Sequence, residues 1–260
     1  MPAALPARER THTMMKQARN GALALAAMLC CAVAFATEVK LFMMEVPPFT
    51  VNEPTRKGIV GDIVLEAIRR AGHTAQLIVV PSARAMSLVE SEQSEDQFLM
   101  PLARQPAREA HYSWIAPVIK INRAFFSLDR KVRSFDEARA SFRHIAVARG
   151  TAGVNILHDH GFSDTQIYRV SDTIAGAKML MLGRVDAWYG PELQFRSWQH
   201  EADPTERAQA SALLGTTDNY LVCSLRCDPP LQAQLADAIA KMRKDGSIKA
   251  IEARYGIRAP

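Results

Sequence analysis

The chain has 260 residues, and its 32 lysines and arginines outnumber its 27 aspartates and glutamates, which gives a formal net charge of +5. These basic residues form no stripe along the sequence, so nucleic-acid binding has little support. Glycine motifs that cradle phosphate and the Gly-x-Ser-x-Gly motif of a nucleophile elbow are both missing from the sequence. The sequence therefore indicates no cofactor and offers no compelling catalytic residue.

The amino-terminal segment has the pattern of a secretory signal peptide. Lys16 and Arg19 precede an apolar run over residues 22–35, and small residues surround a cleavage position after Ala36. The run is shorter than the roughly 20 apolar residues that a membrane span needs. We expect residues 1–36 to be removed and the chain from Thr37 onward to reach the periplasm. A retained membrane anchor is the alternative.

Two further features of this segment bear on its processing. Leu29, rather than a small residue, precedes Cys30, which disfavours a lipid-modified cysteine. A translation start at Met14 or Met15 would suit the segment better than the first methionine. The segment carries four basic residues and one acidic residue, so the net charge of the remaining 224 residues falls to +2. The basic balance is thus partly a property of the export signal.

The exported part is long enough for one large or two small domains. It contains two cysteines, Cys223 and Cys227. In an oxidising compartment they could form a short-loop disulfide, because at helical spacing their Cα atoms would lie about 6 Å apart. Two buried thiols are the alternative. With no histidine nearby, the pair makes a poor metal site.

The first part of the exported chain alternates short apolar strands with amphipathic helices. Strands are predicted at residues 39–44, 75–80 and 98–102, and helices at residues 59–71 and 83–90. Pro47 and Pro48 stiffen the turn after the first strand, and Gly72 ends the first helix. This order predicts a largely parallel sheet with helices on both faces.

The same pattern then repeats after an extended segment over residues 119–128. Ser134 and Glu137 form a capping box that opens a short helix. The later elements are strands at 144–148, 166–170, 185–189 and 220–224, and helices that reach 158, run through 181–183, and cover 231–244 and 248–255. Two similar α/β units joined by an extended segment predict two lobes.

Several short motifs occur in a characteristic order along the exported chain. They are Pro47-Pro48-Phe49, Gly58 with Asp62 and Gly72, the segment 101–109 (PLARQPARE), the segment 112–117 (YSWIAP), Arg149-Gly150-Thr151, the segment 182–187 (LGRVDA), Lys244-Asp245-Gly246 and Arg254-Tyr255-Gly256. In this order and spacing, the chain resembles the amino-acid-type periplasmic substrate-binding proteins of ABC transporters.

The resemblance implies a type II periplasmic-binding-protein fold with two lobes around a cleft. Residues 37–121 and 215–260 would form the first lobe, and residues 122–214 the second, with hinge crossings near Asn122 and Thr216. Such hinges let the lobes close over a ligand. The implied function is capture of a small polar, carboxylate-bearing molecule and its delivery to a permease in the inner membrane. We expect a monomer that is not an enzyme.

Arg108 is the leading ligand-binding candidate that the resemblance supplies. In the family, the arginine after the third strand contacts the ligand's carboxylate, and a guanidinium fork matches two carboxylate oxygens. A surface arginine paired with Glu109 or Glu92 is the alternative. Ala103 stands where amino-acid binders often carry threonine, so a hydroxyl contact is missing. Arg84 is a second candidate, at the mouth of the cleft or on a helix surface.

The resemblance also points to residues on both walls of the expected cleft. Phe49 follows the stiff turn and would form an apolar wall, with a core position as the alternative. Glu45 could receive a ligand ammonium or cap the turn. Thr151 lies at a helix start whose backbone N–H groups suit an anion, and it could bind the ligand or cap the helix.

Tyr189 and Glu192 lie near the position where amino-acid binders place an acid for the ligand's α-amino group. In direct alignment that position falls on Pro191, one residue before the glutamate. This departure weakens the case for α-amino-acid recognition and leaves related organic acids open.

Two other functions fit the same scaffold. The first is a periplasmic enzyme of the cyclohexadienyl dehydratase type, in which Glu45 or Glu192 would act as a general acid in the closed cleft. The second is an accessory role, in which the ligand-loaded protein docks to a receptor instead of a permease.

Overall fold

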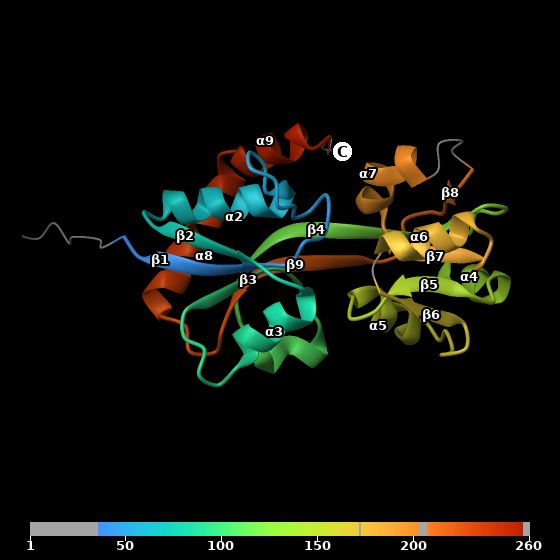
Figure 1. Cartoon of the computed structure of the whole chain (residues 1–260), viewed down its shortest axis with the longest axis horizontal. Helices are drawn as coiled ribbons and strands as arrows, with labels where there is room; N and C mark the ends of the chain where they lie inside the picture. Colours follow the sequence, from blue (N-terminus) through green and yellow to red (C-terminus); the bar gives the residue numbers. More distant parts are fainter. Residues whose placement is uncertain (1–35, 172, 203–206, 257–260) are drawn as a thin grey trace, which may run out of the picture. The chain divides into compact units, whose positions relative to one another are not determined.

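The structure is a computed structural model that describes residues 36–171, 173–202 and 207–256 (Figure 1). The expected signal peptide, apart from Ala36, lies outside the described residues, as does the membrane anchor that was its alternative. Among the described helices, none combines the length and apolar character that a membrane crossing requires.

The described strands follow the order β2-β1-β3-β9-β4-β7-β5-β6, with β8 paired to β4. Pairing is parallel between β1 and both β2 and β3, and between β5 and both β6 and β7. The long strand β4 pairs antiparallel with β9 and then with β7, so it passes from one parallel group to the other. The strands are β1 (Glu38–Met43), β2 (Thr74–Val79), β3 (Gln97–Ala103), β4 (Ser113–Ser127), β5 (Ile145–Ala148), β6 (Ile167–Val170), β7 (Ala187–Pro191), β8 (Gln209–Ala210) and β9 (Thr216–Cys223).

Each parallel group has helices on both faces, because its strands are apolar on both faces. We call the group β1–β3 with its helices the first lobe, and β5–β8 with their helices the second lobe. In the first lobe these are α2 (Gly58–Arg70), α3 (Ser82–Glu90), η1 (Pro106–His111), α8 (Pro229–Lys244) and α9 (Ser247–Arg254). In the second lobe they are α4 (Phe135–Ser141), α5 (Ala152–Asp159), α6 (Thr173–Met181) and α7 (Glu192–Ala202).

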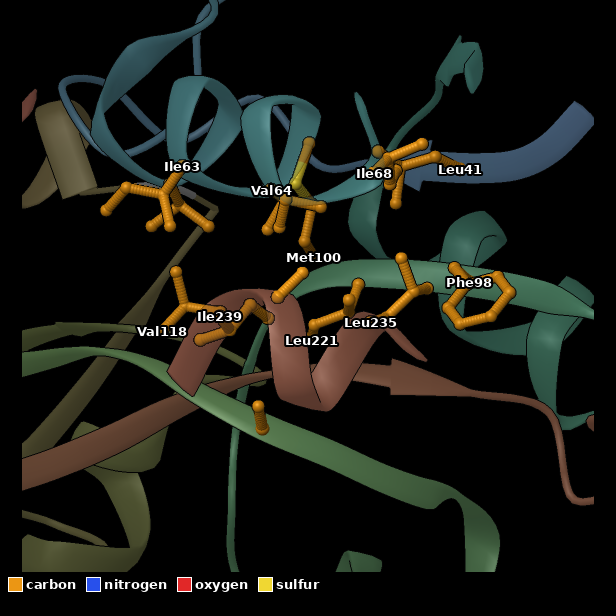
Figure 2. Close-up of a cluster of buried hydrophobic side chains, with 14 of the residues drawn as sticks. Leu41, Ile63, Val64, Ile68, Phe98, Met100, Val118, Leu221, Leu235 and Ile239 are labelled. Carbon is orange, nitrogen blue, oxygen red and sulfur yellow. The ribbon is translucent and has the colours of Figure 1, made fainter. Parts of the chain in front are cut away.

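Side chains of β1 alternate between the two faces of the first lobe. Leu41 and Met43 belong to the core that α2, α8 and α9 cover, whereas Phe42 and Met44 face the core beneath α3. Figure 2 shows the first of these cores, in which Ile63, Val64 and Ile68 of α2 gather with Leu235 and Ile239 of α8. Burying one such side chain stabilises the fold by about 1.5–3 kcal/mol.

The second lobe repeats this arrangement with aromatic residues. Phe125 of β4 and Tyr189 of β7 belong to the core that α4 and α5 cover, with their ring centroids 4.6 Å apart. The neighbouring residues Phe126 and Trp188 face the opposite core, where Phe195 of α7 stacks on Phe126. The hydrophobic cores of the first lobe are therefore separate from those of the second. The strand β4 contributes residues to cores in both lobes.

The two expected hinge crossings lie side by side in the structure. Asn122 of β4 is paired with Thr216 of β9. Immediately beyond this pair, the Arg123 N–H donates to the Gly215 carbonyl over 3.0 Å, and the Leu214 N–H donates to the Arg123 carbonyl over 2.8 Å. The chain thus leaves and re-enters the first lobe through one antiparallel ladder.

Most predicted elements match the observed ones to within about four residues. The exception is β4, which begins at Ser113, well before the extended segment predicted from residue 119, and three elements were missed. They are η1, β8 and α7, which begins at Glu192 directly after the end of β7. At helix starts the local signals operate as expected: the Ser134 hydroxyl accepts from the Glu137 N–H, and the Asp228 carboxylate accepts from the Leu231 N–H. Cys223, the last residue of β9, is joined by a disulfide to Cys227 in the segment before α8, so the pair does not lie within a helix.

A cluster of charges joins α2 to the start of α9. Hydrogen bonds from Arg69 and then Arg70 lower the pKa of the Glu66 carboxyl to about 2. Arg70 also bonds Asp245 at 2.5 Å, and the pKa of Asp245 falls to about 2, chiefly through hydrogen bonds from Ser247. Because a carboxyl with a depressed pKa stabilises the fold above its ordinary pKa, this contribution is lost as the pH falls towards 2.

Glu66→Gln should therefore lower the free energy of unfolding at neutral pH, with a difference from the parent that closes between about pH 4.5 and pH 2. Urea unfolding across this pH range measures the difference. A difference that stays constant down to pH 2 would contradict the assignment.

Candidate functional site

A cavity of about 820 Å³ opens between the lobes beside the β4–β9 crossing. This volume lies within the range of about 300–1,000 Å³ that is usual for small-molecule sites. Its walls come from both lobes: Met44, Glu45, Val46, Phe49, Val79, Val80, Pro81, Ser82, Ala83, Met86, Pro101, Leu102, Ala103 and Arg108 from the first, and Ala148, Arg149, Gly150, Thr151, Ala152, Ser171, Tyr189, Gly190, Pro191 and Gln194 from the second. Ile121, Arg123 and Asn219 contribute from the crossing strands.

Arg108 projects into this cavity from η1 and is partly buried. Its guanidinium donates to the Ala103 carbonyl over 3.3 Å and to the Gly150 carbonyl over 2.9 Å. Burial lowers the pKa of Arg108, with Tyr112 and Glu90 opposing the shift. The surface pairing considered from sequence is not what the structure shows, since Glu109 bonds Arg104 instead. Arg108 is thus a cleft cation whose bonded partners are neutral carbonyls.

The wall opposite Arg108 is the start of α5 in the second lobe. Thr151 occupies the N-cap position, but its hydroxyl donates to the Ala148 carbonyl over 2.8 Å and caps no helix N–H. The first-turn N–H groups of the helix, which have no intrahelical acceptor, are therefore left without a side-chain cap beside the cavity. Such a helix start favours an anion through both its free donors and its dipole.

Two hydrogen bonds cross directly from one lobe to the other at the cavity. The Arg108 guanidinium reaches Gly150 in the β5–α5 loop, and the Asn155 amide of α5 donates to the Gln105 side chain over 2.5 Å. Leu193 of α7 also packs against the core of the first lobe. The described conformation is therefore one in which the lobes are in contact.

Six of the eight candidate ligand-binding residues line this cavity. Phe49 lines it and also belongs to the first-lobe core, and Ala103 lines it as a buried residue. Tyr189 is buried, with its hydroxyl donating to the Leu214 carbonyl over 2.7 Å. Thr151 and Arg108 line it as described, and the exposed Glu45 lies at its edge.

The other two candidates do not line the cavity. Arg84 lies exposed on α3, with its neighbours Ser82 and Ala83 reaching the cavity in its place. Glu192 begins α7 and bonds Arg196 over 2.7 Å, while Pro191 takes the lining position. The acid that would meet an α-ammonium group from the second lobe is consequently missing from the described lining.

Sequence reasoning missed three buried polar residues of the lining: Arg123, Gln194 and Asn219. Arg123 and Asn219 are each 5% exposed, and Gln194 is 4% exposed. Their signal in the sequence is weak, because each lies where an apolar stretch meets other polar residues, such as Asn122 before Arg123 and Asp218 before Asn219. Arg123, between Ile121 and Ala124, is the most informative, since a charge in a strand with buried neighbours requires a reason.

One group of side chains has the geometry of metal ligands among the described residues: Asp96 with Cys223 and Cys227. Both sulfurs are held in the disulfide, so the group has no thiolate to offer a metal.

No family model and no curated protein sequence matches the chain. Solved structures do. A histidine kinase sensor domain with similarity to periplasmic binding proteins aligns with a TM-score of 0.74 at 15% identity, covering 86% of this chain and 98% of that domain. The chain has the two-lobed periplasmic-binding-protein fold.

Two ligand-binding proteins with this fold are similarly close. The arginine-, lysine-, histidine-binding protein ArtJ of Geobacillus stearothermophilus aligns with a TM-score of 0.72 at 14% identity, covering 86% of this chain and 96% of that protein. EhuB in complex with hydroxyectoine aligns with a TM-score of 0.71 at 19% identity, covering 85% of this chain and 88% of that protein. The agreement at such low identity rests on the fold alone.

The cavity wall near the crossing depends on a glycine with positive φ. Gly215 has φ +97°, and a Cβ there would lie 2.6 Å from the Tyr189 hydroxyl oxygen. Gly215→Ala should lower the free energy of unfolding by about 1–2 kcal/mol for the left-handed backbone and by roughly 1–3 kcal/mol more for displacing the buried tyrosine.

Gly183→Ala is the matched control, because Gly183 has φ +66° and open space around its Cβ position. Urea denaturation of both variants separates the backbone cost from the packing cost. Equal losses in the two variants would show that Tyr189 is free to move.

Proposed function

We propose that the protein is a periplasmic solute-binding protein, which closes its two lobes over a small carboxylate-bearing molecule and delivers it to an ABC permease. The observation that carries the proposal is the position of Arg108. This guanidinium lies in the cavity between the lobes, bonds only neutral carbonyls there, and lies on the same cavity as the uncapped start of α5.

This arrangement suits a carboxylate bound from both sides. The guanidinium fork of Arg108 would hold the oxygens from the first lobe, and the N–H groups at the start of α5 would hold them from the second. A ligand bound in this way adds attraction between the lobes, which favours the closed state. Capture and closure would thus be one event at the same carboxylate.

Several independent features support a role in transport. The amino-terminal segment has the pattern of an export signal. The chain shares its fold with proteins that are described as binding arginine, lysine, histidine or hydroxyectoine. The fold itself provides two crossing strands between lobes, which is the geometry of a hinge.

The cavity favours an organic acid over an α-amino acid. Glu45 is the one carboxylate among the described lining residues, and it is exposed at the edge. Pro191 occupies the position from which amino-acid binders reach the ammonium group, and Glu192 is bonded to Arg196. An ammonium group in the cavity would therefore lose its water without gaining a buried counter-charge.

The same observations give little support to a dehydratase. A general acid for such a reaction has to lie within hydrogen-bond reach of the substrate in the closed cleft. Of the two acids considered for this role, Glu192 is outside the cavity lining and Glu45 is exposed. The proposal therefore assigns binding, with no catalytic residue.

Arg108→Ala should abolish the thermal stabilisation that a bound organic acid confers, since the carboxylate loses its guanidinium partner. A ligand at 100-fold above its Kd stabilises a protein by about 2.7 kcal/mol. Differential scanning fluorimetry of the exported chain against a panel of organic acids and amino acids measures this shift.

Arg84→Ala is the control, because it removes a cation of the first lobe that does not line the cavity. It should retain the full shift. An Arg108→Ala protein that keeps the shift would remove this residue from the site and overturn the proposal.

A further inference from the structure

The crossing strand β4 buries a cation at the base of the cavity. Arg123 is 5% exposed and belongs to the cavity lining. Both of its backbone groups are fixed by the ladder with Gly215 and Leu214. The position of the Arg123 backbone is thus set by the crossing strands and not by either lobe alone.

The guanidinium of Arg123 has few hydrogen-bond partners. Its Nη2 lies 3.4 Å from the Thr217 hydroxyl oxygen, at the long end of the hydrogen-bond range, and its Nε has no partner. It forms no ion pair with a carboxylate of the described residues. Burial lowers its pKa, and the group opposing the shift is the phenol of Tyr189 rather than a carboxylate.

A guanidinium remains charged in proteins, so this one cannot avoid its desolvation by losing a proton. Removing such an ion from water costs several kcal/mol unless an opposite charge and full hydrogen bonding offset it. Thr217 supplies neither a negative charge nor enough acceptors. Since Arg123 faces a cavity that is open to solutes, the missing counter-charge is one that a ligand can bring.

Arg123 and Arg108 reach the same cavity from different elements. Arg108 comes from η1 in the first lobe, and Arg123 comes from the strand between the lobes. Among the described lining residues, three arginines, the third being Arg149, face one glutamate, so the formal net charge is +2. The rest of the cavity lining is largely apolar and includes Val79, Val80, Met86, Leu102 and Ile121.

We infer that the ligand is a dicarboxylate, with one acid group on Arg108, the second on Arg123 and a hydrocarbon body against the apolar wall. This inference rests on the proposed function, since it specifies the solute that the same cleft captures. A monocarboxylate would leave Arg123 buried without an anion, whereas a dicarboxylate neutralises both guanidiniums. The second acid group is therefore the feature that the cleft selects.

The test compares linear dicarboxylates, from succinate to pimelate, with their monomethyl esters, which keep the length of the molecule and remove one charge. Isothermal titration calorimetry gives Kd values for the parent chain, for Arg123→Met and for Arg84→Met as the control. In the parent and the control, the best diacid should bind at least about 10-fold more tightly than its ester, the value of one charge-assisted hydrogen bond.

In Arg123→Met the diacid should bind no more tightly than the ester, while the ester, held by Arg108, keeps its parent Kd within about 3-fold. The thermal midpoint of the empty variant should equal or exceed that of the parent, because a buried ion without a counter-charge is replaced by an apolar side chain. This second readout separates a loss of binding from a loss of folding.

Equal binding of diacids and esters by the parent chain would overturn the inference and leave the proposed function intact. Retention of the 10-fold preference in Arg123→Met would overturn it in the same way, as would a lower thermal midpoint of the empty variant, which would make Arg123 a structural residue. If no acid of either class binds the parent chain, the proposed function itself fails.

Discussion

The antiparallel ladder between β4 and β9 is the constraint on which the rest of the structure depends. It pairs Asn122 with Thr216 and continues into the backbone bonds between Arg123 and Gly215. Each lobe buries its own apolar residues, and β4 supplies residues to the cores of both. Among the described residues, β9 pairs with β3 of the first group and β4 pairs with β7 of the second, so the geometry of the cavity depends on this one pair of strands.

The architecture could be predicted from the sequence because it follows local rules. Consecutive apolar residues such as Phe42 and Met43 predict a strand buried on both faces, and Asp228 before a proline predicts a helix start. The start of α7 was harder to predict, because Glu192 follows β7 with no intervening loop. Sequence reasoning expects a turn between a strand and a helix, and here the chain changes direction at Pro191.

The site was less predictable than the fold, because the residues that meet there lie far apart along the chain. Arg108 could be named because a local motif surrounds it, but its partner Gly150 lies 42 residues away. Arg84 and Arg108 look alike as isolated cations, and only tertiary packing leaves the first exposed and the second in the cavity. Arg123 could not be predicted as a site residue, because the residues around it indicate a strand and say nothing about what that strand faces.

The hydrogen bond from Arg108 to the Gly150 carbonyl has a consequence for selectivity. In the structure, the Gly150 backbone oxygen already accepts a hydrogen bond from the Arg108 guanidinium over 2.9 Å, as a ligand oxygen would in the proposed function. If a neutral amide or ester accepted from the same nitrogen, the guanidinium would exchange one uncharged acceptor for another, and the binding free energy would change little. An ionised acid makes a bond roughly twice as strong, so it alone profits from the exchange. Under the proposed function, the Gly150 carbonyl would thereby compete with a bound solute for Arg108 and disfavour uncharged solutes.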